Sequence, residues 1–195
     1  MPSQALQHWR GAAQDVLAEV VNAHQAVGGT GPGRRWLTQE INYAYVTRLT
    51  AQFQGFCREL HSEAARAVSL GVPSLSLRIV VSQRLTEGRA LDKGNPHAGN
   101  LGSDFNRFGF NFWNAVGHDH PHSARRQAKL DELIQWRNGI VHDDLDRRRR
   151  ASDLNPPRLT LRVCRSWHGS LNNLAASFDN VMTDQCENLT GTRPW

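Results

Sequence analysis

Apolar residues recur every three or four positions along most of the chain, which is the spacing of one face of an α-helix. This pattern predicts a first helix over about residues 4–26, which ends where the glycine-rich segment 28–33 begins. A longer second helix is expected to begin near Thr38, whose hydroxyl can cap the free backbone N–H groups of the first turn. Its apolar face would consist of Ile41, Val46, Leu49, Phe53, Phe56, Leu60, Ala64 and Ala67. Two polar residues, Glu59 and His61, flank that face.

The rest of the chain carries the same periodicity in shorter segments. Pro73 is expected to precede a third helix, Ser103 to cap an aromatic-rich helix, Pro121 to open the next helix and Thr160 to cap the last one. The apolar residues expected to face inward from these helices are Leu77, Val80, Val81, Leu85, Phe105, Phe108, Phe112, Val116, Leu130, Leu133, Ile134, Val141, Cys164, Trp167, Leu171, Leu174, Phe178 and Val181. The predicted fold class is therefore all-α, a bundle of about five or six helices.

The composition is that of a packed globular chain. With 195 residues, 39% hydrophobic and 21% charged, we expect a single domain over residues 1–195, in which residues 1–34 form an N-terminal helix and a loop. Three isolated cysteines form no C-x-x-C pair, so neither a zinc site nor a disulfide framework is indicated, and a cytoplasmic location is expected. Charged residues interrupt the first 25 positions and no long apolar run follows, so we expect no signal peptide and no membrane span.

The formal net charge of +5 favours anionic partners, nucleic acid first among them. Nearly all basic residues are arginine, with lysine only at Lys93 and Lys129. The planar guanidinium suits two-point phosphate binding, although a coding bias toward arginine would give the same composition. The candidate residues for binding an RNA backbone are Arg147, Arg148, Arg149 and Arg150. The alternative is a charged loop balanced by the neighbouring aspartates.

Chemically useful residues gather in the segment 133–143, near the expected end of a helix. Arg137 can hold a phosphate, and His142 can accept or donate a proton near neutral pH. Asn138 and His142 are four residues apart and share a helix face, so the amide could orient the imidazole, while Gly139 leaves room for another backbone or a substrate. These groups can support attack of a ribose 2′-hydroxyl on its own phosphodiester without a metal or another cofactor.

The spacing of Arg137 and His142 points to a dimer. On an ideal helix the two residues lie about 140° apart around the axis and about 7.5 Å apart along it, so they do not share one face. Two copies of the helix end meeting at a two-fold axis would supply both a base and an acid to one cleft. We therefore expect a homodimer with residues 130–142 at or beside the interface. The alternative is a salt-bridge or interface role, for example with Asp131 or Asp143.

The sequence R-N-G-I-V-H at 137–142, followed by an acidic residue, resembles the R-N-x-x-x-H motif of the HEPN superfamily, in which the motif lies late on a helix of a small α-bundle. The resemblance covers most of residues 38–190. It implies a metal-independent endoribonuclease with Arg137 and His142 catalytic and Asn138 supporting them. It also implies an RNA substrate, a homodimer, a toxin–antitoxin or antiviral defence role and a possible antitoxin or regulatory protein as partner. A second implication is a non-catalytic HEPN-like module that binds RNA, nucleotide or a protein.

The chain departs from one HEPN branch, the toxins paired with nucleotidyltransferase antitoxins, in which a tyrosine follows the histidine by two residues. Here that position is Asp144, so silencing through modification of that tyrosine is not expected.

Two further interpretations carry less weight. The histidines of segment 118–122 could chelate a metal, but a solvated loop at the entry of a helix is preferred and no metal site is expected. A helical structural protein with no nucleic-acid role is the remaining hypothesis, and it predicts no salt-dependent RNA binding.

Overall fold

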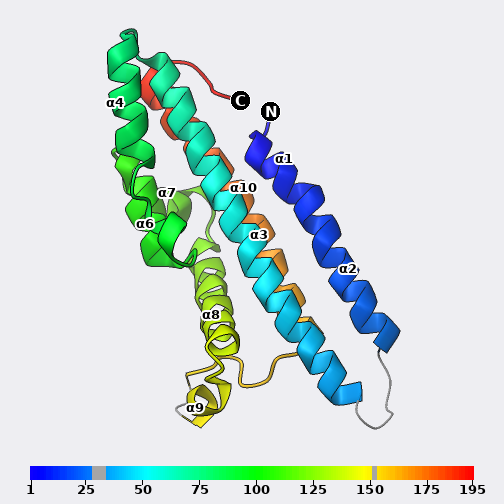
Figure 1. Cartoon of the computed structure of the whole chain (residues 1–195). Helices are drawn as coiled ribbons and strands as arrows, with labels where there is room; N and C mark the ends of the chain where they lie inside the picture. Colours follow the sequence, from blue (N-terminus) through cyan, green and yellow to red (C-terminus); the bar gives the residue numbers. More distant parts are fainter. Residues whose placement is uncertain (28–33, 151–152) are drawn as a thin grey trace.

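The computed structural model describes residues 1–27, 34–150 and 153–195, and every regular element within these ranges is a helix (Figure 1). In chain order the elements are α1 (Gln4–Arg10), α2 (Ala12–Val27), α3 (Arg34–Gly71), α4 (Leu75–Thr86), α5 (Ala90–Lys93), α6 (Ala98–Phe105), the 3-10 helix η1 (Asn106–Phe108), α7 (Phe112–Asp119), α8 (Ser123–Val141), α9 (Leu145–Arg150) and α10 (Leu161–Thr190). The all-α class is therefore confirmed. The described ranges contain more helices than the five or six expected, because some expected helices are split and short helices form within expected loops.

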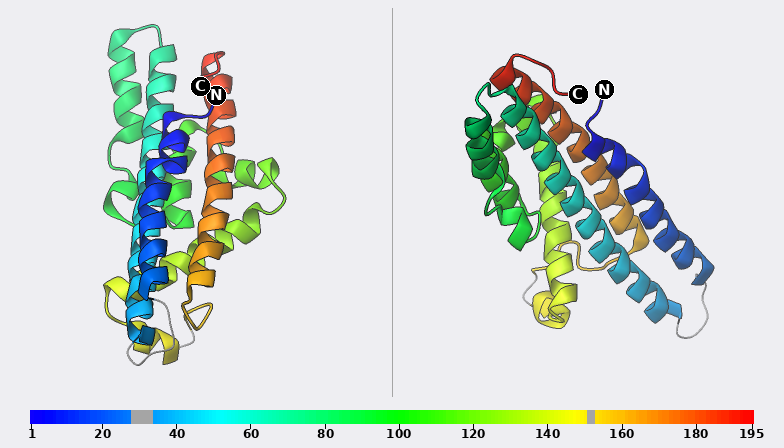
Figure 2. Two further views of the ribbon diagram at one scale, coloured as in Figure 1. Left: turned by 90° about the vertical axis from the view of Figure 1, so that its right-hand side faces the viewer. Right: turned by 45° about the horizontal axis from the view of Figure 1, so that its top comes forward.

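The long helix α3 is the axis of the fold. Its 38 residues span about 57 Å at 1.5 Å per residue, and it contacts α1, α2, α4, α8 and α10. Figures 1 and 2 show α1 and α2 lying along one side of α3, with α10 beside it. The two chain termini lie close together, whereas α9 lies at the opposite end. No helix in the described ranges is long and apolar enough to cross a membrane.

The core lies between α3 and α10 and is closed by aromatic residues from α6 and α7. The apolar residues predicted to face inward from α10 are all buried: Cys164, Trp167, Leu171, Leu174, Phe178 and Val181. Phe105 stacks on Phe112 with ring centroids 4.5 Å apart, and Phe112 meets Phe178 edge-on at 4.8 Å. The assignment of the aromatic segment to the core rather than to a base-stacking surface is therefore confirmed.

The first helix, predicted as one helix over about residues 4–26, is interrupted and forms two helices. Gly11, with φ −102° and ψ −104°, breaks it into α1 and α2. Ser3 caps α1 through its hydroxyl, which accepts the N–H of Leu6, and the same residue donates to the buried carboxylate of Asp179 on α10. This tie holds the start of the chain against the last helix.

Several predicted caps are wrong. Helix α3 already begins at Arg34, so Thr38 lies inside it. His97 rather than Ser103 caps α6, because its Nδ1 accepts the N–H groups of Gly99 and Asn100. Pro121 precedes α8, which begins at Ser123. Thr160 does cap α10.

The expected apolar face of the third helix, now α4, is largely uncovered. Leu77 and Val80 are more than half exposed, Val81 is partly buried, and only Leu85 is buried. The reason is that α4 packs mainly against α3 and η1, which cover one narrow face of the helix. Val141 at the end of α8 is also exposed rather than inward-facing.

His61, expected beside the apolar face of α3, is completely buried between the rings of Phe105 and Phe108. Its Nε2–H donates to the backbone oxygen of Asp104 at 3.1 Å. Burial lowers the pKa of His61 to about 4, and Arg89 is among the charges that add to the shift. The imidazole is therefore a neutral core group, which periodicity alone does not reveal.

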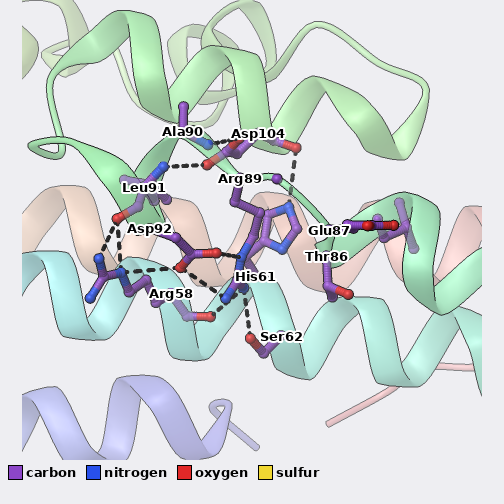
Figure 3. Close-up of polar contacts among 12 residues, drawn as sticks. Arg58, His61, Ser62, Thr86, Glu87, Arg89, Ala90, Leu91, Asp92 and Asp104 are labelled. Carbon is purple, nitrogen blue, oxygen red and sulfur yellow. Dashed lines mark hydrogen bonds and ion pairs between the residues drawn. The ribbon is translucent and has the colours of Figure 1, made fainter.

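Around His61, a network of charged side chains ties the segment before α6 to α3 (Figure 3). The buried carboxylate of Asp104 accepts the backbone N–H groups of Ala90 and Leu91, at 2.9 and 2.8 Å. From α3, the guanidinium of Arg58 donates to the backbone oxygen of Leu91. Asp92 forms ion pairs with Arg58 and Arg89. These contacts fix the position of the short helix α5 against α3.

We expect truncation of the α10 core to destabilise the fold. Leu171→Ala removes a fully buried side chain and should lower the free energy of unfolding by about 2 to 5 kcal/mol. Leu189→Ala is the matched control, because that leucine is 49% exposed on the same helix and its loss should change stability by less than about 0.5 kcal/mol. Urea unfolding measures both, and equal effects would contradict the assigned face of α10.

His61 should make the fold less stable in acid. Between pH 6.5 and about 4 the unfolded chain binds a proton at this residue and the folded chain does not, so stability falls as the pH falls through this window. The loss attributable to His61 approaches ~3 kcal/mol. His61→Gln keeps an N–H donor but does not titrate, so its unfolding free energy should change less between pH 7 and pH 4. Parallel pH profiles of the two proteins would contradict this interpretation.

Candidate functional site

The R-N-x-x-x-H segment lies at the C-terminal end of α8, as the sequence indicates. Leu130, Leu133, Ile134 and Trp136 anchor this helix in the core, which directs Arg137 and Asn138 to its half-buried side. Helix α8 ends at Val141, so His142 is the first residue past its end, and its backbone N–H still bonds to Asn138 O at 3.0 Å. The His142 side chain is exposed.

The chain reverses immediately after His142. Asp143 adopts a left-handed conformation with φ 52°, a position where glycine is usual. The N–H of Asp144 then bonds to Gly139 O at 3.0 Å, and that of Asp143 bonds to Ile140 O at 3.4 Å. These paired reverse bonds close the last turn of α8 and start α9.

Gly139 serves the packing of α9, not the approach of a substrate. A Cβ atom at this position would lie 2.7 Å from Leu145 Cδ2, closer than Cβ contacts allow, and 3.2 Å from Arg148 Cδ, which is a tight contact. Glycine therefore lets α9 fold back against the end of α8. The space that the sequence assigned to another backbone or a substrate is filled by two side chains of the same chain.

A short chain of hydrogen bonds holds Arg137. The Oδ1 atom of Asn138 accepts from Arg137 Nη1 at 3.2 Å and from Asn95 Nδ2 at 2.7 Å. Within the described part of the chain, no hydrogen bond joins Asn138 to the His142 imidazole. Asn138 therefore does not set the tautomer of His142, the role that the sequence predicts for it. Asn138 instead links Arg137 to the loop before α6.

Asn95 was missed in the sequence because nothing in a Gly-Asn-Pro loop shows which helix that loop will meet. The loop is itself held in place, since Asn100 Nδ2 donates to the Asn95 backbone oxygen at 2.8 Å.

Two turns earlier on α8, Asp131 accepts the backbone N–H of Ala98. Burial raises the pKa of Asp131, and that hydrogen bond and nearby His97 oppose the shift.

The surroundings of Arg137 leave its positive charge available to bind an anion. Among the residues that the structure describes, no carboxylate lies within ion-pair distance of its guanidinium, and the salt bridges to Asp131 or Asp143 that the alternative hypothesis invoked are not formed. A half-buried arginine without a carboxylate partner can bind an external anion at little cost.

The four candidate substrate-binding arginines lie on α9, directly beside the end of α8. Arg148 forms an ion pair with Asp144 at 2.6 Å, whereas Arg150 is exposed. The side chains of Arg147 and Arg149 lie outside the described residues. The fold thus brings the arginine segment next to the motif, a proximity that its place in the sequence also suggested.

The histidines of segment 118–122 do not form a convincing metal site. His120 Nε2 lies 3.2 Å from Arg126 Nη2, a cation that a metal ion would have to displace. Over residues 1–27, 34–150 and 153–195, no cluster of three histidine, cysteine, aspartate or glutamate residues is suitably arranged to bind a metal ion.

Comparison of the chain with protein-family models, with curated proteins and with solved structures finds no significant match. Functional inference therefore depends on the geometry of the α8 end and on the motif itself.

We expect Asn95 and Asn138 to be energetically coupled. Each single alanine substitution removes the same 2.7 Å hydrogen bond, so the double variant should be more stable than the sum of the single effects predicts, by about 1 kcal/mol. The matched control pairs Asn138→Ala with Asn173→Ala, which lies on exposed α10 surface and bonds only within its own helix. Urea unfolding should show additivity for that pair, and additivity for both pairs would contradict the proposed link.

Proposed function

We propose that this protein is a metal-independent endoribonuclease of the HEPN type, a single HEPN-like domain that acts as a homodimer. The observation that carries the proposal is the end of α8, where a half-buried Arg137 without a carboxylate partner in the described chain lies five residues before an exposed His142. Arginine and histidine at a helix end are the two groups that this reaction needs for charge stabilisation and proton transfer.

The reaction would begin with removal of the proton from a ribose 2′-hydroxyl by a neutral His142 imidazole. The 2′-oxygen attacks the adjacent phosphorus, the bond to the 5′-oxygen breaks, and that oxygen receives a proton from an imidazolium. The products are a 2′,3′-cyclic phosphate and a 5′-hydroxyl end. Arg137 would stabilise the negative charge that develops on the phosphoryl oxygens, and the hydrogen bonds through Asn138 to Asn95 would hold its side chain in position.

The dimer follows from the number of proton-transfer groups. One chain offers one histidine at this site, whereas the reaction uses a base and an acid. The end of α8 is open to a second copy, because Val141, His142 and Asp143 are all exposed. A two-fold axis near this end would place two copies of His142 and Arg137 around one cleft.

The α9 segment supports RNA as the substrate. Its arginines follow the motif closely in the sequence, and the exposed Arg150 would contact a phosphate near the scissile one. The resemblance to HEPN ribonucleases favours a cytoplasmic toxin or antiviral defence role with an antitoxin or regulatory protein as partner. The residue at the tyrosine position of one toxin branch, Asp144, is paired here with Arg148, so regulation through that tyrosine is not part of the proposal.

One observation favours a second candidate, a non-catalytic module that binds RNA, nucleotide or a protein. Within the described residues no hydrogen bond orients the His142 imidazole, whereas catalytic histidines are commonly held by a second group. A binding module needs only the charge of Arg137 and the α9 arginines.

The two candidates differ in whether RNA is cut in the presence of EDTA. Purified protein should cleave RNA but not DNA, which lacks the nucleophile, and mass spectrometry should find 2′,3′-cyclic phosphate ends. His142→Ala should lower the rate by roughly 10²- to 10⁴-fold, and Arg137→Ala should also lower it, with both variants folded. The matched controls are His118→Ala on α7 and Arg193→Ala in the C-terminal segment, exposed residues of the same types outside the α8 end.

Cleavage that requires added magnesium and leaves 5′-phosphate ends would overturn this mechanism. Intact RNA that is bound, with both variants weakening binding alike, would favour the non-catalytic module. Light scattering tests the dimer separately: a fully active monomer at micromolar concentration would remove the composite site while leaving the RNA chemistry in place.

A further inference from the structure

A groove lies between α3 and α4, at the end of the molecule away from the α8 site. Its apolar walls are Leu70 of α3 and Ile79 of α4, and small side chains, Ala65, Ser69 and Ser82, form its floor. The cavity measures about 360 Å³. We call this surface the α3–α4 groove.

The walls of the α3–α4 groove are unusually exposed for their residue types. Leu70 is 57% exposed and Ile79 is 56% exposed, and Leu75 beside them on α4 is 73% exposed. Isolated exposed leucines are common, but two exposed aliphatic side chains that line the same groove favour an interaction surface. A helix as apolar as α4 is normally covered on more than one face.

The charged side chains that line the α3–α4 groove are Arg66 and Arg78, and the flanking acids, Glu63 and Glu87, lie outside its lining. From Ala64 to Thr86 the sequence contains no aspartate or glutamate and three arginines, Arg66, Arg78 and Arg84. Arg66 is exposed at the rim, while Arg78 lines the groove and donates to the backbone oxygen of Val72. The nearest preceding acid, Glu63, is engaged by the N–H groups of Gln4 and Ala5 on α1.

We propose that the α3–α4 groove docks an acidic amphipathic helix of a partner protein. Apolar residues at helical spacing on that helix would fit between Leu70 and Ile79, and its carboxylates would meet Arg66 and Arg78. Helix α4 has 12 residues and is about 18 Å long, so the docked helix has about three turns. The small side chains of the floor let a third helix approach α3 and α4 closely.

The shape of the groove favours an acidic helix over a lipid bilayer or a nucleic acid. A bilayer would cover a convex apolar face more readily than a groove between two helices. A nucleic acid would use the arginines but leave the aliphatic walls uncovered. A groove with aliphatic walls and a basic rim fits an acidic helix best.

The α3–α4 groove is separate from the proposed ribonuclease site. Figure 1 shows α4 near one end of α3 and α9 at the other, and Figure 2 agrees. A second copy of this chain bound at α4 would therefore not bring two α8 ends together. The inference goes beyond the proposed function, and each can fail without the other.

The test measures binding of a designed, fluorescently labelled 14-residue helix with leucines on one face and glutamates on the other, by anisotropy with the full chain. Ile79→Ser should weaken binding about tenfold, and Arg66→Glu at least about fivefold. The matched controls, Leu77→Ser and Arg84→Glu, change an exposed aliphatic residue and an arginine outside the groove lining and should weaken binding less than about twofold. A peptide with lysine in place of glutamate should bind at least about tenfold more weakly.

Equal losses in groove and control variants, or equal binding of the acidic and basic peptides, would overturn the proposal. So would the absence of peptide binding. Binding to vesicles of phosphatidylserine and phosphatidylcholine that Ile79→Ser abolishes, without peptide binding, would identify a membrane surface instead. A concentration-dependent dimer that Ile79→Ser dissociates would identify a second copy as the occupant.

Discussion

The burial of apolar residues between α3 and α10 is the interaction on which the rest of this structure depends. Both helices bury long stripes that include Tyr45, Phe53 and Trp167, and the aromatic rings of α6 and α7 pack against α10 at Phe178. Burial of each large apolar side chain contributes about 1.5 to 3 kcal/mol, so this seam supplies much of the driving force for folding. The short helices depend on neighbouring elements for their positions: α5 packs on α3 and α6, and α9 packs on the end of α8.

Polar contacts determine where the shorter segments attach to this seam. Ser3 and Asp179 join the first helix to the last, and Asp104 binds two backbone N–H groups at the start of α5. Buried carboxylates of this kind cost desolvation energy unless they are fully hydrogen-bonded, so they specify one arrangement among several that the apolar core would accept. The candidate site benefits directly, because the loop between α5 and α6 carries Asn95 to Asn138.

The end of α8 and the α3–α4 groove present different surfaces. The α8 end, α9 and their arginines form a polar region with an exposed histidine, whereas near the last residues of α3 the α3–α4 groove has aliphatic walls and a basic rim. Within the described residues, Arg137 has no carboxylate partner at the first surface, and Leu70 and Ile79 are more than half exposed at the second. The proposed RNA would bind at the end of α8 and the proposed acidic helix in the α3–α4 groove, independently of each other.

By itself, the sequence determined the all-α class, the inward face of α10, the aromatic core and the location of the Arg137 to His142 segment at a helix end. Each of these follows from local periodicity or from short-range geometry within one helix. The tertiary structure alone decided that His61 is a core residue, that α4 is mostly exposed, that Gly139 receives α9, and that Asn138 meets Asn95 rather than His142. These features depend on which segments far apart in the chain come together, and residue spacing within a single helix carries no information about its neighbours.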